Sequence, residues 1–136
     1  MNPILRNVLA VIAGGIVGGV VNMGIVTISP SIIPPPDGTD ITTMEGLQEA
    51  MLYFEPKHFI MPFLAHAVGT LVGAYTAARI AVTHKMKLAL LIGAFFLVGG
   101  IMAVMSLSSL MWYSIVDLVG AYIPMGWIGG RLATRS

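Results

Sequence analysis

Four long apolar stretches, separated by one long and two short connections, limit the fold of this chain more than any other feature. They run from about Leu9 to Ile28, Phe59 to Val82, Leu88 to Leu107 and Leu110 to Leu132. Each approaches the ~20 residues that a helix needs to cross ~30 Å of hydrocarbon. Backbone amides in lipid must be satisfied within their own segment, and the runs lack the period-two alternation of membrane β-strands. The sequence therefore predicts an all-α polytopic membrane protein, a four-helix transmembrane bundle.

The predicted organisation is a single membrane domain over residues 1–136. We expect spans at about 7–29, 58–82, 87–108 and 110–132, with an outer loop at 30–57. The first run follows Arg6 and resembles a signal peptide, but no small-residue cleavage site precedes a polar segment, so we predict a retained first span.

Composition agrees with membrane embedding and excludes several kinds of chemistry. The residues are 57% hydrophobic and 10% charged, whereas about 25% of residues in soluble domains are charged. The absence of cysteine excludes disulfides, thiolate nucleophiles and Cys-ligated metals. The few basic residues are scattered at predicted helix ends, so we expect no nucleic-acid partner.

The outer loop carries its own local signals. Residues 29–36 read Ser-Pro-Ser-Ile-Ile-Pro-Pro-Pro, an extended polyproline-like stretch that should not continue a helix. Thr42 and Glu45 form a capping-box pattern. Apolar residues follow at helical spacing and predict a short amphipathic helix, which either lies on the outer membrane surface or caps the bundle: Met44, Leu47, Met51 and Phe54. A structured loop without a partner fits these residues equally well.

The basic residues predict the topology. Lys57 alone falls on the loop side of the predicted spans, and the other basic residues fall on the opposite side: Arg6, Arg79, Lys85, Lys87, Arg131 and Arg135. By the positive-inside rule both termini are cytoplasmic, as expected in a bacterial inner membrane. Trp112 and Tyr113 are predicted at the outer interface and Trp127 near the inner one.

Small residues recur four apart along the spans, in the G-x-x-x-G manner. Such faces let helix backbones approach closely, either within one chain or between copies. The predicted packing residues are Gly14, Gly18, Gly69, Gly73, Gly126 and Gly130.

Three strongly polar side chains interrupt the apolar runs: Asn22, His66 and Asp117. At ~1.5 Å rise per residue, each lies roughly 10–12 Å below the outer end of its helix. A buried carboxylate needs a partner, so we predict a His66–Asp117 contact that Asn22 can bridge, with Thr70 and Tyr122 as further candidates for binding a ligand or proton. A purely structural lock, contributing about 0.6 kcal/mol, is the alternative.

The third and fourth spans differ in their polar content. The third carries no strongly polar residue, which favours a scaffold or lipid-facing helix. In the fourth, Pro124 cannot donate to the Gly120 carbonyl and predicts a kink one turn from Asp117.

No catalytic signature is present. The G-x-S-x-G, H-E-x-x-H and P-loop patterns are missing. A hydrolase built on Ser106 or Ser114 with His66 and Asp117 would have no predicted oxyanion hole, and methionine-rich copper binding is weakly indicated. We predict no cofactor, no metal site and a non-enzymatic protein.

The length resembles that of the small multidrug transporters and the fluoride channels. Asn22 stands where the first span of the former has a glutamate, and the charge bias opposes the dual topology of the latter. Residues 55–62 and 117–124 (EPKHFIMP and DLVGAYIP) look like stretches of uncharacterised small bacterial membrane proteins with four transmembrane helices. That resemblance covers most of the chain and implies no activity.

Two functions fit these observations. The first is a self-associating or accessory bundle with a polar pocket in its outer half, whose partners are the lipid bilayer and further copies or a larger membrane complex. The second is a small transporter or channel that binds a proton or cation at His66 and Asp117.

Overall fold

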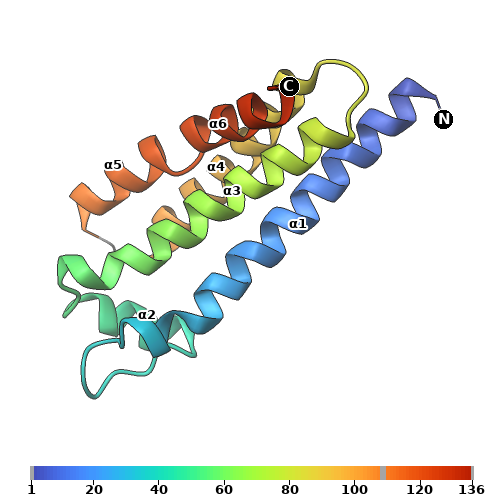
Figure 1. Ribbon diagram of the computed structural model, residues 1–136. Coiled ribbons are helices and arrows are strands. Elements are labelled where there is room, and N and C mark those ends of the chain that lie inside the picture. The colour runs from blue at the N-terminus through green and yellow to red at the C-terminus, as the bar shows by residue number, and fades with distance from the viewer. Residues whose placement is uncertain (1, 108–109, 136) are drawn as a thin grey trace.

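The computed structural model describes residues 2–107 and 110–135 and is all-α over these residues. Its elements are α1 (Pro3–Ile32), α2 (Met44–Met51), a short 3-10 helix η1 (Pro56–Phe59), α3 (Ile60–Ile80), α4 (Lys85–Ser106), α5 (Met111–Gly120) and α6 (Ile123–Thr134). The long helices run alongside one another (Figure 1). Both termini and the α3–α4 turn lie at one end of the bundle, here called the terminal end. Residues 33–59 lie at the other, the loop end.

Three helical segments are long and apolar enough to cross a membrane: Pro3–Ile32, Pro56–Ile80 and Lys85–Ser106. They correspond to the first three predicted spans. The α4–α5 connection, predicted around residues 106–109, is only partly described, because residues 108–109 lie outside the described part of the chain.

The fourth predicted span is not one helix. It consists of α5, with 10 residues, and α6, with 12. At ~1.5 Å per residue each covers only about half of the hydrocarbon thickness. Pro124 has no amide hydrogen for the Gly120 carbonyl, and Tyr122 adopts φ −116° and ψ −73°, outside helical values. The proline therefore accompanies a break between two helices, where the sequence predicted a kink in one.

The first helix extends further than predicted. It continues through Pro30 to Ile32, so the expectation that residues 29–36 are extended is wrong for its first part. Pro30 cannot donate to the Val26 carbonyl, but the Ser29 hydroxyl donates to that oxygen at 2.9 Å. This side-chain bond replaces the missing backbone bond, and the last turn stays helical.

Glycines allow α1 and α3 to pack with their backbones in contact. A Cβ added to Gly14 would lie 2.6 Å from the Gly73 carbonyl oxygen, and one added to Gly18 would lie 2.7 Å from that of Gly69. On α6, Gly126 faces the α4 backbone at Ala89, and Gly130 faces Met86 and Ala89. All six predicted packing glycines thus lie at contacts within the chain.

The predicted short helix is present in the loop segment at the loop end, and it caps the bundle. Thr43, one residue after the predicted Thr42, accepts a hydrogen bond from the Gly46 amide at 3.0 Å and starts α2. Met51 packs with Phe59 and Tyr113 in a buried cluster. Gln48 Nε2 donates to the Ser106 carbonyl at 2.8 Å, which joins α2 to the end of α4.

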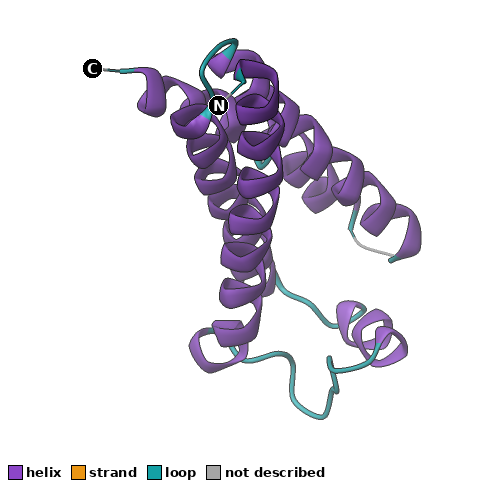
Figure 2. Cartoon of the chain, turned by 90° about the vertical axis from the view of Figure 1, so that its right-hand side faces the viewer, coloured by secondary structure: helices purple, strands orange, loops and turns teal. Residues whose placement is uncertain are grey.

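At the loop end the helices separate. Figure 2 shows α4 and α5 diverging from α1 and α3 toward the end of α4 and the start of α5, with the loop segment beneath them. At the terminal end they are held together, because Arg6 Nε donates to the Ile80 carbonyl at 2.9 Å and Lys85 Nζ donates to that of Ala78 at 3.0 Å. Basic side chains here cap the last carbonyls of α3, where the helix dipole favours positive charge.

Candidate functional site: a His–Asp pair between two cavities

Asp117, on α5, is one of the few buried polar side chains of the described residues and is 3% exposed. Its Oδ1 lies 2.7 Å from Nδ1 of His66, on α3. His66 is partly open, with 29% of its side chain exposed. The structure therefore brings together the two residues that the sequence predicts as partners, and α5 reaches α3 through this contact.

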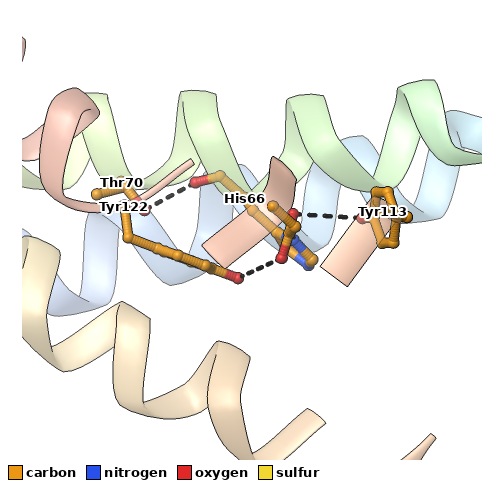
Figure 3. Close-up of polar contacts among 5 residues, drawn as sticks. His66, Thr70, Tyr113 and Tyr122 are labelled. Carbon is orange, nitrogen blue, oxygen red and sulfur yellow. Dashed lines mark hydrogen bonds and ion pairs between the residues drawn. The ribbon is translucent and has the colours of Figure 1, made fainter. Parts of the chain in front are cut away.

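Two tyrosine hydroxyls complete the surroundings of the carboxylate. Tyr113 donates to Oδ1 at 3.3 Å, and Tyr122 donates to Oδ2 at 3.2 Å. The two rings approach from opposite sides, with His66 between them (Figure 3). A carboxylate has about four lone-pair positions, so the His66 and tyrosine bonds leave one unused.

The break between α5 and α6 positions this cluster. Tyr113 and Asp117 are four apart and lie on one face of α5. Tyr122 lies in the break itself, and its ring returns to stack on the His66 imidazole, with centroids 5.8 Å apart. An unbroken helix would place residue 122 about 140° around the axis from residue 117. The break allows both tyrosines to reach the same carboxylate.

Thr70 acts on His66 and does not touch the carboxylate. It is 1% exposed, and its hydroxyl donates to the His66 carbonyl at 2.7 Å, as drawn in Figure 3. Its oxygen retains lone pairs that accept hydrogen bonds. Thr70 therefore contributes an acceptor on the side of His66 that faces the terminal end.

Asn22 does not form the predicted bridge. Its Oδ1 is buried and has no hydrogen-bond partner among the described residues. It lines a cavity of about 200 Å³, here called the inner cavity, together with His66, Thr70 and Tyr122. An acceptor left unpaired in a buried place costs roughly 1–3 kcal/mol, and this cost is relieved when a donor enters the cavity.

A second cavity lies toward the loop end. This outer pocket, of about 270 Å³, is lined by the end of α1, the loop and α2, the start of α3, the end of α4, and Tyr113 and Asp117 of α5. The two cavities share three lining residues: His66, Gly100 and Ala103. His66 thus stands at the boundary between them, with Asp117 in the wall of the outer pocket.

Two residues of this site are not predicted from the sequence. Tyr113 was predicted at the membrane interface but is 8% exposed; its spacing of four from Asp117 is the signal that points to the contact. Gly100 lies on the span predicted as a scaffold, yet a Cβ there would lie 2.6 Å from the Tyr122 hydroxyl. Nothing in the sequence distinguishes Gly100 from Gly99, which has no neighbour within 4 Å.

Metal ligation finds no support in the described residues, since they contain no group of three or more His, Asp or Glu side chains that could hold an ion. The site offers a carboxylate, an imidazole and hydroxyl and amide oxygens. These groups can hold or exchange a proton and can bind a cation or a hydrogen-bond donor.

Comparison of the chain with protein-family models, with curated proteins and with solved structures finds no match. The expected resemblance to small bacterial proteins with four membrane spans therefore gains no support. The findings establish a small all-helical protein with three helices long and apolar enough to span a membrane.

Proposed function

We propose that this chain is a small, non-enzymatic membrane transporter that binds a proton or cation at the His66–Asp117 pair. The observation that carries the proposal is the position of the pair. Asp117 is a buried carboxylate in the wall of the outer pocket, bonded to two tyrosine hydroxyls and to His66, and His66 lines both cavities next to a broken helix. Ionisable residues at membrane depth are costly and commonly mark ion or proton pathways. Broken helices at such depth occur where the backbone lines a cavity.

A purely structural lock explains less of the arrangement. A polar contact between membrane helices contributes only about 0.6 kcal/mol on average. The free-energy cost of burying the Asp117 carboxylate exceeds this contribution, so holding α5 on α3 does not by itself explain an acidic residue here. A lock also requires no cavity on either side of His66, and no buried acceptor such as Asn22 Oδ1 left without a partner. Proton or cation binding accounts for both features.

We also propose an orientation of the chain in the membrane. We place the loop end outside and the terminal end in the cytoplasm, in a bacterial inner membrane, because the terminal end carries all basic residues except Lys57. The outer pocket then faces outward. Self-association is the competing proposal, and the observation in its favour is that Gly15 and Gly19 on α1 have no neighbour within 4 Å.

The test compares flux and folding in the same variants. Wild type, Asp117→Asn, His66→Gln and the double variant are reconstituted in liposomes that contain a pH-sensitive dye, and a potassium diffusion potential drives proton entry. We expect wild type to acidify the lumen faster than empty liposomes, with the single variants at or near the empty-liposome rate. Asp40→Asn, which changes an exposed loop carboxylate, is the control and should retain full flux.

Thermal unfolding in detergent separates the two roles of the pair. A structural lock predicts that each variant unfolds at a clearly lower temperature. If the variants fold as stably as wild type and lose flux, the lock is excluded. Flux retained in the double variant, or no flux in wild type, contradicts the transport proposal.

A further inference from the structure

The walls of the outer pocket are apolar and aromatic. Phe54 and Phe59 line it near the loop, Met51 and Val104 line it from α2 and α4, and Tyr113 lies between Phe59 and the carboxylate. The Phe59 and Tyr113 rings are stacked with centroids 4.3 Å apart. Such walls favour a ligand with an apolar body, and aromatic faces also attract cations.

The inner limit of the pocket is polar and carries the one acidic side chain in its lining. His66, Gly100 and Asp117 are the innermost pocket residues of α3, α4 and α5, counted from the loop end. With the His66 proton on Nδ1, the Asp117 carboxylate accepts two hydrogen bonds at Oδ1 and one at Oδ2, and it keeps one lone-pair position on Oδ2. Of these bonds the one from Tyr113 is the longest, at 3.3 Å, and its ring belongs to the pocket wall. Oδ1 already accepts from both His66 and Tyr113, so a donor arriving through the pocket on the Tyr113 side reaches it by displacing the Tyr113 hydroxyl, the longer of these two bonds.

Among the described residues, no lysine or arginine lines the pocket. Its other histidine, His58, accepts a hydrogen bond from the Glu55 amide at Nδ1, over 2.8 Å, and so carries no proton on that nitrogen. The charge of the pocket lining therefore comes from the His66–Asp117 pair, without a fixed cation to repel a positively charged ligand.

The loop around the pocket is acidic. Against the single Lys57 it carries five exposed carboxylates: Asp37, Asp40, Glu45, Glu49 and Glu55. Hydrogen bonds from the Thr42 hydroxyl and then from its amide lower the pKa of Asp40. The loop end therefore attracts cations at neutral pH, although salt weakens this attraction.

We propose that the outer pocket binds a hydrophobic organic cation, with its ammonium group on Asp117 and its apolar body against the aromatic walls. The inference rests on the proposed role of the His66–Asp117 pair as a cation-binding site. It adds the ligand class, which apolar walls, a buried carboxylate, the absence of a lining lysine or arginine and an acidic loop all favour.

The experiment measures the binding of phenylbutylammonium and of its neutral counterpart phenylbutanol, by calorimetry on the full chain in detergent. A hydrogen bond to a charged group contributes about 1.5–3 kcal/mol, so we expect the ammonium compound to bind about tenfold or more tightly. This preference should vanish in Asp117→Asn, while the weaker, apolar binding of the alcohol remains.

A second pair of variants tests the location of the ligand without touching the charged pair. Val104→Phe fills part of the pocket and should weaken binding of both compounds. Val98→Phe adds the same bulk at a position on α4 that is 55% exposed and outside the pocket lining, and it should leave binding unchanged. Val98→Phe should also retain proton flux.

The outcomes separate this inference from the proposed function. Equal binding of ammonium and alcohol, no binding of either, or unchanged binding in Val104→Phe overturns the inference, even where proton flux is intact. A clear ammonium preference in a protein that shows no flux supports the binding site and overturns the transport proposal alone.

Discussion

At the scale of single residues, the candidate site depends on a hydrogen atom in place of a methyl group. Gly100 leaves the space that the Tyr122 ring fills, and a Cβ there would lie within 2.7 Å of three ring or hydroxyl atoms. Tyr122 in turn holds Asp117 Oδ2 and stacks on His66. Gly100 is therefore a positioning residue for a carboxylate that it does not touch.

We predict that Gly100→Ala is destabilising and Gly99→Ala is not. The first forces Tyr122 to move, and overpacking of this kind costs about 1–3 kcal/mol. The second places its methyl group where nothing lies within 4 Å, and alanine favours a helix by up to about 1 kcal/mol over glycine. Thermal unfolding in detergent measures the difference. Equal unfolding temperatures would show that Tyr122 is not held against α4.

The residue scale also shows how far sequence reasoning reaches. Burial cost and helical depth predict the contact of His66 with Asp117. They leave out Tyr113 and Gly100, because an aromatic ring near a span end is usual at the interface and glycines are alike until their neighbours are known. Asn22 shares the depth of the pair, yet its oxygen has no partner among the described residues; depth alone does not give the direction of a side chain.

At the scale of elements, α1 carries two glycine pairs with different surroundings. Gly14 and Gly18 meet the α3 backbone, whereas Gly15 and Gly19 meet nothing within 4 Å. The spacing of the two pairs is identical, so the sequence cannot assign one to packing within the chain and the other to an open face. The position of α3 against Gly14 and Gly18 makes that pair the one that packs within the chain.

We predict that two neighbouring substitutions on α1 differ in their effect on stability. Gly18→Ala should lower the unfolding temperature, because its Cβ would lie 2.7 Å from the Gly69 carbonyl oxygen and 2.9 Å from Phe96. Gly19→Ala should leave stability unchanged in a monomer. Light scattering of wild type and Gly19→Leu in detergent then tests self-association. An oligomer in wild type that is lost in Gly19→Leu favours the competing proposal. If wild type and Gly19→Leu are both monomeric, self-association is contradicted.

Other elements show where local rules fail. The rule that proline ends a helix predicts the wrong end for α1, because the Ser29 hydroxyl supplies the bond that Pro30 cannot. For Pro124 the sequence predicts a kink within one helix. Tyr122 departs from helical geometry there, and the fourth predicted span is divided into α5 and α6. A proline signals a lost hydrogen bond, and the surrounding side chains decide whether it is replaced.

At the scale of the whole molecule, charge divides the two ends. The acidic loop lies at one end, and all basic residues except Lys57 lie at the other. The three long apolar helices and this separation are readable from composition along the chain, which is why the coarse architecture was predictable. The cavities depend on how α4 and α5 diverge, and no local pattern encodes that divergence.

We predict that the loop end faces the outside of the cell. The chain has no cysteine, so Asp37→Cys and His84→Cys each introduce a single thiol without further changes. A membrane-impermeant maleimide should label Asp37→Cys on intact cells and His84→Cys only after lysis, because the positive-inside rule places the α3–α4 turn in the cytoplasm. The reverse pattern, or partial labelling of both from outside, contradicts this orientation.

The length of α1 has a consequence for how a solute reaches the pocket. Its 30 residues extend over ~45 Å, while the hydrocarbon layer is ~30 Å thick and membrane helices rarely tilt beyond ~40°. In the proposed orientation, with the basic terminal end anchored at one surface, the last turns of α1 would extend into the opposite headgroup layer. Val26, Ser29 and Pro30, which line the outer pocket, are in those turns. The pocket mouth then opens among lipid headgroups, where amphiphiles accumulate, so a weak site can fill from the membrane at low aqueous concentration.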